Sequence, residues 1–284
     1  MHSALPLDHL VINTRFGTDA AAGLFSALGF TLTPQGRHAF GSVNHLMVFQ
    51  DDYLELIGLP TDGGTLRQEI LDNPAGIDGL VYKPDSADAV HEALTRSGAA
   101  VAPLHAFSRP LELDGVRHEA RFRTVRYQPG AFEAGRVYYC QHLTPELVWR
   151  RDWQAHANGV RGLSGLTLVS TRAQADAQAY AQAAFGQVHL DEQGFSIPSP
   201  GFSVTLLDAD AYGQRYGDLA CDALGRESFF GAISLRAADP DALERHVAAL
   251  GDALPTRPWR RDGHRGLAVS LPDLNTLLDF IYES

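Results

Sequence analysis

Two short, mostly apolar segments of the chain contain candidate functional side chains. Residues 7–12 (LDHLVI) hold His9, and residues 53–57 (YLELI) hold Glu55. Both segments have the length and composition of buried β-strands, and an ionisable side chain inside such a strand costs free energy unless it is paired, hydrogen-bonded or bound to a metal. A histidine and a carboxylate in strands on either side of one predicted helix therefore predict a site for a divalent metal ion.

The same succession of elements recurs four times along the chain. In each unit a short apolar strand precedes a helical stretch that ends near a glycine, and alternating apolar residues then predict about three more strands. Glycine adopts the left-handed conformation at a helix end at little cost, so we expect the four glycines to close the helices. The predicted helices span residues 19–28, 86–97, 173–185 and 240–250, and the closing glycines are Gly29, Gly98, Gly186 and Gly251.

One βαβββ unit leaves its sheet exposed, so we expect the units to pair. The predicted fold class is α+β, with four βαβββ modules paired into two domains that have curved mixed β-sheets. The boundary is expected in residues 155–159, a small polar stretch without apolar periodicity. The predicted domains are therefore residues 1–158 and residues 159–284.

Composition and charge exclude several classes of partner. A net charge of −11 with no offsetting basic stretch argues against nucleic acid and anionic membranes as partners. No apolar run approaches the length of a membrane span, and the first residues lack the features of a signal peptide. Two cysteines do not form a disulfide framework and fit a reducing compartment, so a cytoplasmic location is expected. The GxSxG, P-loop and CxxC motifs are absent, which leaves hydrolase, NTPase and disulfide-redox chemistry without support.

The chain resembles the vicinal oxygen chelate superfamily, which includes glyoxalase I, extradiol dioxygenases and many glyoxalase-like proteins. Residues 7–11 resemble the first strand of that superfamily, and residues 36–45 with 52–57 resemble its glyoxalase-like branch. The resemblance is specific over residues 5–60, moderate over 76–150, and rests on the repeat alone over 159–284. It implies paired βαβββ units that form a cup around a metal ion, with the ligands on the first and last strands of each unit.

The resemblance implies His9 and Glu55 as metal ligands. Glycines occupy the position of His9 in the other three units, which indicates that the fold needs no side chain there and favours a functional reason for His9. Measured back from the following prolines, Cys140 aligns with Glu55, and His142 lies on the same strand face. Either is a candidate third ligand. His9, Glu55 and His142 would suit iron, manganese, nickel or zinc, with the identity left open. The three glycines are Gly79, Gly165 and Gly231.

Further candidates follow from the same region. Glu55 has a second possible role as a catalytic base, if its pocket raises its pKa towards neutrality. His38 and Asn44 match family positions and are candidate substrate contacts, although they also suit strand edges or turns. Arg123 shares a predicted strand face with Arg121 and is a candidate contact for an anionic ligand, the alternative being a solvated face. In the second domain only Asp279 offers a metal ligand, so that domain is expected to be degenerate as a metal site.

These features predict a metal-dependent lyase or isomerase of the glyoxalase type that acts on a small oxygen-rich or aromatic substrate. An extradiol-type dioxygenase is the nearest alternative, because two histidines and a carboxylate suit it. A metal-free protein that binds and sequesters a small molecule is an alternative from a different class. A small-molecule ligand is the expected partner, and the chain is expected to be a monomer or a homodimer.

Overall fold

The computed structural model describes residues 4–38, 41–113, 115–191 and 194–283. Residues 1–3, and residues 39 and 40 of the glyoxalase-like segment, therefore lie outside the described residues. The elements of the first half are β1 (Leu7–Arg15), α1 (Thr18–Ala27), β2 (Gly36–His38), β3 (Ser42–Val48), β4 (Tyr53–Gly58), α2 (Gln68–Asp72), β5 (Gly76–Tyr82), α3 (Ala87–Arg96), β6 (His105–Leu113), β7 (Val116–Arg126) and β8 (Arg136–His142). Those of the second half are β9 (Val160–Ser170), α4 (Ala173–Ala183), β10 (His189–Asp191), β11 (Gly194–Ser199), β12 (Phe202–Leu207), α5 (Ala209–Tyr216), β13 (Ser228–Ala237), α6 (Pro240–Ala249), β14 (Thr256–Arg261), β15 (His264–Leu271) and β16 (Thr276–Tyr282).

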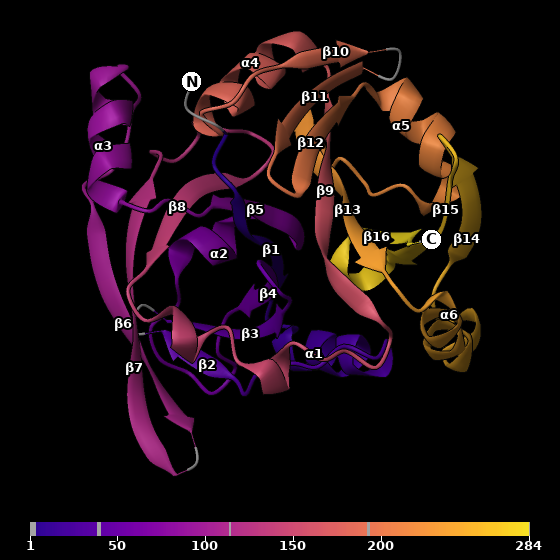
Figure 1. The fold of residues 1–284 in the computed structure, drawn as a ribbon, viewed down its shortest axis with the longest axis horizontal. Coiled ribbons are helices and arrows are strands. Elements are labelled where there is room, and N and C mark those ends of the chain that lie inside the picture. Colours follow the sequence, from indigo (N-terminus) through magenta and orange to yellow (C-terminus); the bar gives the residue numbers. More distant parts are fainter. Residues whose placement is uncertain (1–3, 39–40, 114, 192–193, 284) are drawn as a thin grey trace.

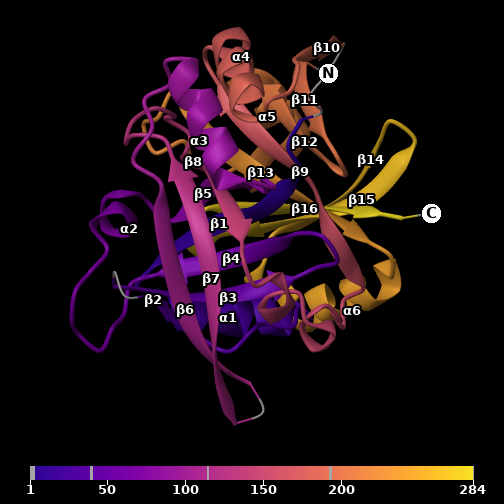
Figure 2. The ribbon, with the colours of Figure 1, turned by 60° about the vertical axis from the view of Figure 1, so that its left-hand side comes forward.

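The strands form two eight-stranded mixed sheets with the same internal order. The first sheet runs β2-β3-β4-β1-β5-β8-β7-β6, and the second repeats this order as β10-β11-β12-β9-β13-β16-β15-β14. In each sheet the first strands of two units pair antiparallel, β1 with β5 and β9 with β13, and so join the units. Both sheets are strongly curved, and the β6–β7 hairpin extends beyond the rest of the molecule (Figures 1 and 2). The predicted α+β fold of four paired βαβββ modules is confirmed.

The four predicted helices are present as α1, α3, α4 and α6, with ends within two residues of those expected. Gly29, Gly98 and Gly251 follow their helices with positive φ angles of 85°, 81° and 58°. The prediction for Gly186 is wrong, because Phe185 takes the left-handed conformation after α4, with φ 53°. Helix α4 ends one residue earlier than the glycine spacing suggests. Helices α2 and α5, which connect β4 to β5 and β12 to β13, were not predicted. None of the described helices is long and apolar enough to cross a membrane.

One apolar core joins the two halves of the chain. It combines one face of each sheet with α1, α3, α4 and α6. Across the junction the rings of Phe30 and Phe280 stack with centroids 6.5 Å apart, and the Tyr139 hydroxyl donates to the Ala183 carbonyl at 2.7 Å. The other face of each sheet, called here the inner face, carries its own smaller apolar cluster. Each half therefore has an inner face whose side chains are separate from the shared core.

Candidate functional site

A cavity of about 320 Å³ lies on the inner face of the first sheet. Its walls come from strands β1, β2, β3, β4, β6, β7 and β8, and from the connections before α2, before β6 and after β8. This volume lies within the range of cavities that hold small molecules. His9, His38, Asn44 and Glu55 line it, so four of the predicted site residues share one cavity.

A β-bulge in β1 turns Asp8 to the same side as His9. Leu7 pairs with Tyr82 and His9 pairs with Val81, so Asp8 is an extra residue opposite β5. Such a residue interrupts the alternation of side chains along a strand. Asp8 is fully buried, and its Oδ2 atom lies 2.7 Å from Nδ1 of His9. Sequence reasoning missed Asp8, although an acid directly before a histidine in an apolar strand was a visible signal.

The imidazole of His9 lies between two carboxylates. Its Nδ1 contacts Asp8, while its Nε2 lies 3.5 Å from Oε2 of Glu55 and 3.2 Å from the hydroxyl of Tyr138. The ring of Tyr53 stacks on the imidazole with centroids 4.3 Å apart, which fixes the ring plane. A carboxylate only accepts hydrogen bonds, so Asp8 favours the tautomer with hydrogen on Nδ1. In the neutral ring the Nε2 lone pair then faces Glu55 and Tyr138.

Glu55 is held as a carboxylate. Burial by itself would raise its pKa, but His9 and other nearby groups, including the amide of Asn44, lower the pKa below its ordinary value. The Asn44 amide donates to Oε1 of Glu55 at 2.6 Å, and its carbonyl oxygen accepts from Nη1 of Arg109 at 3.1 Å. The raised pKa that a base role for Glu55 would need is absent. Glu55 is therefore suited to accept hydrogen bonds or bind a cation.

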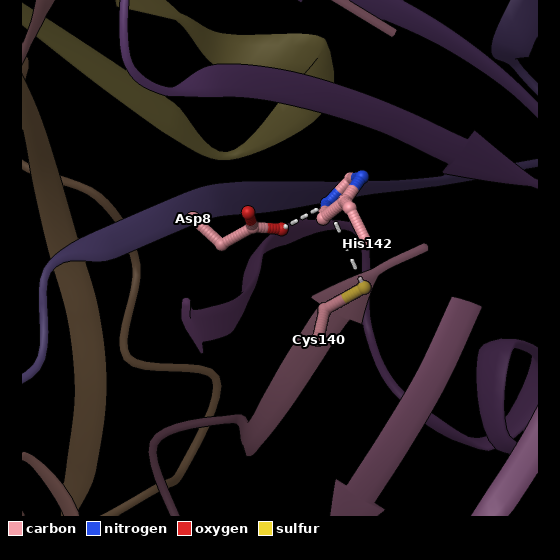
Figure 3. Close-up of side chains that lie close together, drawn as sticks. All are labelled: Asp8, Cys140 and His142. Carbon is pink, nitrogen blue, oxygen red and sulfur yellow. Dashed lines mark hydrogen bonds and ion pairs between the residues drawn. The ribbon is translucent and has the colours of Figure 1, made fainter. Parts of the chain in front are cut away.

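His142 belongs to a second cluster behind His9. Figure 3 shows its Nε2 between Asp8 and Cys140, at 3.0 Å from Oδ2 of Asp8 and 3.8 Å from Sγ of Cys140. In the described part of the chain, these three side chains form the one group of His, Cys, Asp or Glu donors gathered within 4.8 Å. Burial raises the pKa of the Cys140 thiol well above its ordinary value. The structure thus brings His9 to Glu55 and connects His142 to them through Asp8, rather than gathering His9, Glu55 and His142 around one point.

Strand register places Tyr138, and not Cys140, at the position equivalent to Glu55. His9 pairs with Tyr53, and Glu55 lies two residues further along β4. The equivalent Gly79 pairs with Arg136, and two residues further along β8 is Tyr138. The alignment of Cys140 with Glu55 is therefore wrong by two residues, because the connections that follow the two strands differ in length. Burial raises the pKa of the Tyr138 hydroxyl, so it remains protonated.

The remaining predicted contacts divide between the cavity and the outside of the sheet. Nδ1 of His38 and the hydroxyl of Ser42 are hydrogen-bonded to each other at 2.8 Å. Burial lowers the pKa of His38 to about 4, so the ring is neutral at pH 7. Arg123 lies outside the cavity, where its guanidinium pairs with Asp88 of α3. Side chains alternate along β7, so Arg126 faces the cavity and Arg123 faces α3.

The inner face of the second sheet is filled by helix α5. Tyr212 and Tyr216 of this helix are buried there in an apolar cluster. The hydroxyl of Tyr216 donates to Oδ2 of Asp279 at 2.7 Å, and Arg261 donates to the same oxygen at 2.7 Å. A Cβ atom added at Gly231 would lie 2.7 Å from the Tyr212 ring. Asp279, the predicted remnant of a metal site, is thus engaged by two side chains of its own half.

Comparisons with known proteins agree with this architecture. A sequence model of the glyoxalase-like domain family matches residues 7–184, which is more than half of the chain. Among solved structures, a hypothetical protein from Staphylococcus aureus superposes with a TM-score of 0.67 at 11% identity, covering 98% of this chain and 100% of that one. A triple mutant of 4-hydroxymandelate synthase from Streptomyces coelicolor superposes with a TM-score of 0.58 at 12% identity, covering 99% of this chain and 93% of that one.

A third similar structure is a fusion of a xylose isomerase-like TIM barrel with 4-hydroxyphenylpyruvate dioxygenase. It superposes with a TM-score of 0.62 at 12% identity, covering 99% of this chain and 49% of the fusion. Identities this low establish a shared fold. Curated proteins gave no match.

Proposed function

The chain belongs to the glyoxalase-like domain family, and on this premise we propose that it is an enzyme that uses a divalent cation held by His9 and Glu55. The proposed reaction is of the lyase or isomerase type, on a small oxygen-rich or aromatic substrate. The observation that carries the proposal is the 3.5 Å separation of His9 Nε2 and Glu55 Oε2 in the wall of the first-half cavity.

The residues at this point fit a divalent cation. Nitrogen and oxygen ligands each lie about 2.0–2.2 Å from zinc, so adjacent ligand atoms are separated by roughly 3–3.5 Å. The observed 3.5 Å between Nε2 and Oε2 is close to that separation. The Asp8 carboxylate on Nδ1 supplies the support that metal-binding histidines usually have, because it orients the ring and increases its basicity. The Tyr138 hydroxyl is the next oxygen donor, at 3.2 Å from Nε2.

The side chains around this pair have distinct chemical roles in the proposal. A bound cation would act as a Lewis acid on substrate oxygen atoms. Glu55 remains ionised, because its pKa is lowered, and Asn44 fixes its orientation. Tyr138 keeps its proton and can donate a hydrogen bond to a substrate oxygen. Phe107 and Phe122 stack with centroids 5.1 Å apart in the cavity wall and exclude water from one side.

Metal content tests this proposal. We expect protein purified without an affinity tag to hold near-stoichiometric divalent metal by mass spectrometry, and a folded His9→Ala/Glu55→Ala variant to hold none. The matched control is His91→Ala/Glu92→Ala on helix α3, away from the cavity, which should keep the metal. Parent protein that binds no iron(II), manganese, nickel or zinc after reconstitution would contradict the proposal.

A metal-free binding protein is the second candidate, and one observation favours it. In the described part of the chain, no third histidine or carboxylate donor gathers with Nε2 of His9 and the carboxylate of Glu55, since Asp8 contacts the opposite nitrogen of the His9 ring. The carboxylate of Glu55 already accepts a hydrogen bond from Asn44. The same observation weakens the dioxygenase alternative, which requires His142 as a third ligand. Excess substrate separates the candidates, because an enzyme continues to turn over while a sequestering protein stops at one ligand per site.

A further inference from the structure

The guanidinium of Arg109 faces the first-half cavity without an acidic partner. Arg109 lies on β6, its side chain is 5% exposed, and its Nη1 donates to the Asn44 carbonyl oxygen at 3.1 Å. Its buried Nε has no hydrogen-bond partner. Among the described residues no carboxylate lies within ion-pair distance of Arg109, because Glu55 is separated from it by the Asn44 amide. Glu55 attracts Arg109 across the Asn44 amide, but a buried guanidinium without a direct ion pair is still costly, which favours an anionic ligand beside it.

The other two arginines of the cavity wall form ion pairs. Glu69, which also pairs with Arg136, lies 2.5 Å from Arg67 and 3.6 Å from Arg126. His38 is neutral at pH 7, because burial lowers its pKa to about 4. Among the described residues, Arg109 is thus the arginine of this wall that has no ion pair with a carboxylate.

The chain makes room for the Arg109 position. A Cβ atom added at Gly36 would lie 2.3 Å from Oδ1 of Asn44 and 2.7 Å from Nη1 of Arg109. Any other residue at position 36 would therefore displace the Asn44–Arg109 contact. Apolar and aromatic side chains surround the rest of the cavity, including Phe107 and Phe122. The surroundings suit a ring next to an anionic group.

We propose that Arg109 binds the carboxylate of a small aromatic carboxylic acid, with the ring against Phe107 and Phe122. An arginine fork and a carboxylate match in geometry and form strong paired hydrogen bonds. Asn44 contacts both Arg109 and Glu55, so a carboxylate bound to Arg109 would be separated from the proposed cation-binding pair, His9 and Glu55, by one side-chain amide. This inference rests on the proposed function, because it takes the cavity to be the substrate site. It concerns recognition of the ligand, so binding measurements test it without any measurement of activity.

Calorimetric titration with benzoate and phenylacetate, against benzamide and phenylacetamide, tests the inference. The amides have the same shape without the charge. We expect the parent to bind at least one acid more tightly than its amide, and Arg109→Met to lose about tenfold or more of that affinity. Gly36→Ala retains the guanidinium but displaces it, and should weaken binding of the same acid. The matched control is Arg121→Met, an exposed arginine outside the cavity, which should bind as the parent does.

The titrations are repeated in EDTA and with His9→Ala, because a carboxylate can also bind a metal. Acid binding that persists there and depends on Arg109 supports the inference even if the parent proves to be metal-free. The inference is overturned if the acid binds only in the presence of metal and binds Arg109→Met as tightly as the parent. Equal affinity for acids and amides, or no binding of either acid, also overturns it. Circular dichroism shows whether each variant is folded. If Arg109→Met does not fold, the acid affinity of Gly36→Ala decides the outcome.

Discussion

The two halves of this protein share one sheet order but differ in what occupies the inner face. In the first half the inner face borders a cavity of about 320 Å³, and in the second half Tyr212 and Tyr216 of α5 fill the corresponding region. Gly231 is the bulged residue of β13, as Asp78 is of β5, so Ala232 and not the predicted Gly231 is equivalent to Gly79 and His9. Val81 is then equivalent to Ser234, and because Val81 pairs with Tyr138 and Ser234 pairs with Asp279, Asp279 is equivalent to Tyr138. The second half thus has a carboxylate where the first half has a tyrosine, but this carboxylate accepts hydrogen bonds from Tyr216 and Arg261 of its own half.

The difference lies in the connection between the fourth and fifth strands of each half. Helix α2 of the first half has five residues, and its buried side chain is Ile70. Helix α5 of the second half has eight residues and buries two tyrosines. The same sheet order therefore borders an open cavity in one half and a filled core in the other, and the two halves differ in the length and buried side chains of this connecting helix. The presence of the sheet by itself does not indicate a site.

Removing the filling side chain should have the largest effect. Tyr216→Ala would leave a cavity and remove the hydrogen bond to Asp279, so we expect a loss of about 3–5 kcal/mol in the free energy of unfolding. Tyr138→Ala should cost clearly less, because Tyr138 already borders the open cavity. Chemical denaturation followed by circular dichroism measures both. Equal losses would show that α5 does not fill the second half as described.

The link between the halves should make stability depend on pH. Asp52, in the turn between β3 and β4, accepts a hydrogen bond from the Leu163 amide of β9 at 3.1 Å, and burial raises its pKa from 3.8 to about 6. The folded protein therefore favours protonated Asp52. The contribution of Asp52 to the free energy of unfolding falls as pH rises from about 4 to about 6, and above the pKa of the folded state this contribution is lost. The shift corresponds to about 3 kcal/mol.

Asp52→Asn isolates this contribution, because asparagine resembles the protonated acid and can still accept from Leu163. The parent minus variant difference in unfolding free energy should decrease across that pH window and be level above it. Unfolding measured at several pH values between 3.5 and 8 gives the difference. A difference that does not vary with pH would contradict the raised pKa of Asp52.

The smallest effect is expected for Arg123, on the outside of the first sheet. Arg123→Met removes an exposed pair with Asp88, and such pairs contribute little to stability. It should leave both metal content and aromatic-acid affinity unchanged, as measured by the same mass spectrometry and calorimetry. Loss of acid binding in this variant would show that the anion site lies on the outer face and not in the cavity.

Much of the fold was predictable because it depends on local pattern. Helix ends near Gly29, Gly98 and Gly251 follow from the conformational freedom of glycine, and all three have positive φ. The same argument failed at Gly186, because the backbone turned one residue earlier, at Phe185. Helices α2 and α5 were missed, because they are short connections whose helicity depends on packing against the inner faces.

The candidate site was predictable in part. His9, Glu55, His38 and Asn44 line one cavity, since a polar residue in an apolar strand must have a partner. Tyr138 was not expected to lie beside them, because it comes from a strand that is distant in sequence. Arg123 was a candidate contact for an anionic ligand, with a solvated face as the alternative, and alternation along β7 places it outside the cavity, where Arg126 lines the wall instead.

The sequence by itself determined the four repeated units, the α+β class and the presence of a histidine and a glutamate in two buried strands, because these depend on periodicity and on the cost of burying polar groups. The tertiary structure alone decided that a bulge turns Asp8 onto His9, that His142 contacts Asp8 instead of Glu55, and that α5 fills the second half. Register shifts, bulges and the packing of short connections arise from contacts between distant segments. Such contacts do not change the pattern of apolar and polar residues within either segment, so the sequence pattern cannot predict them.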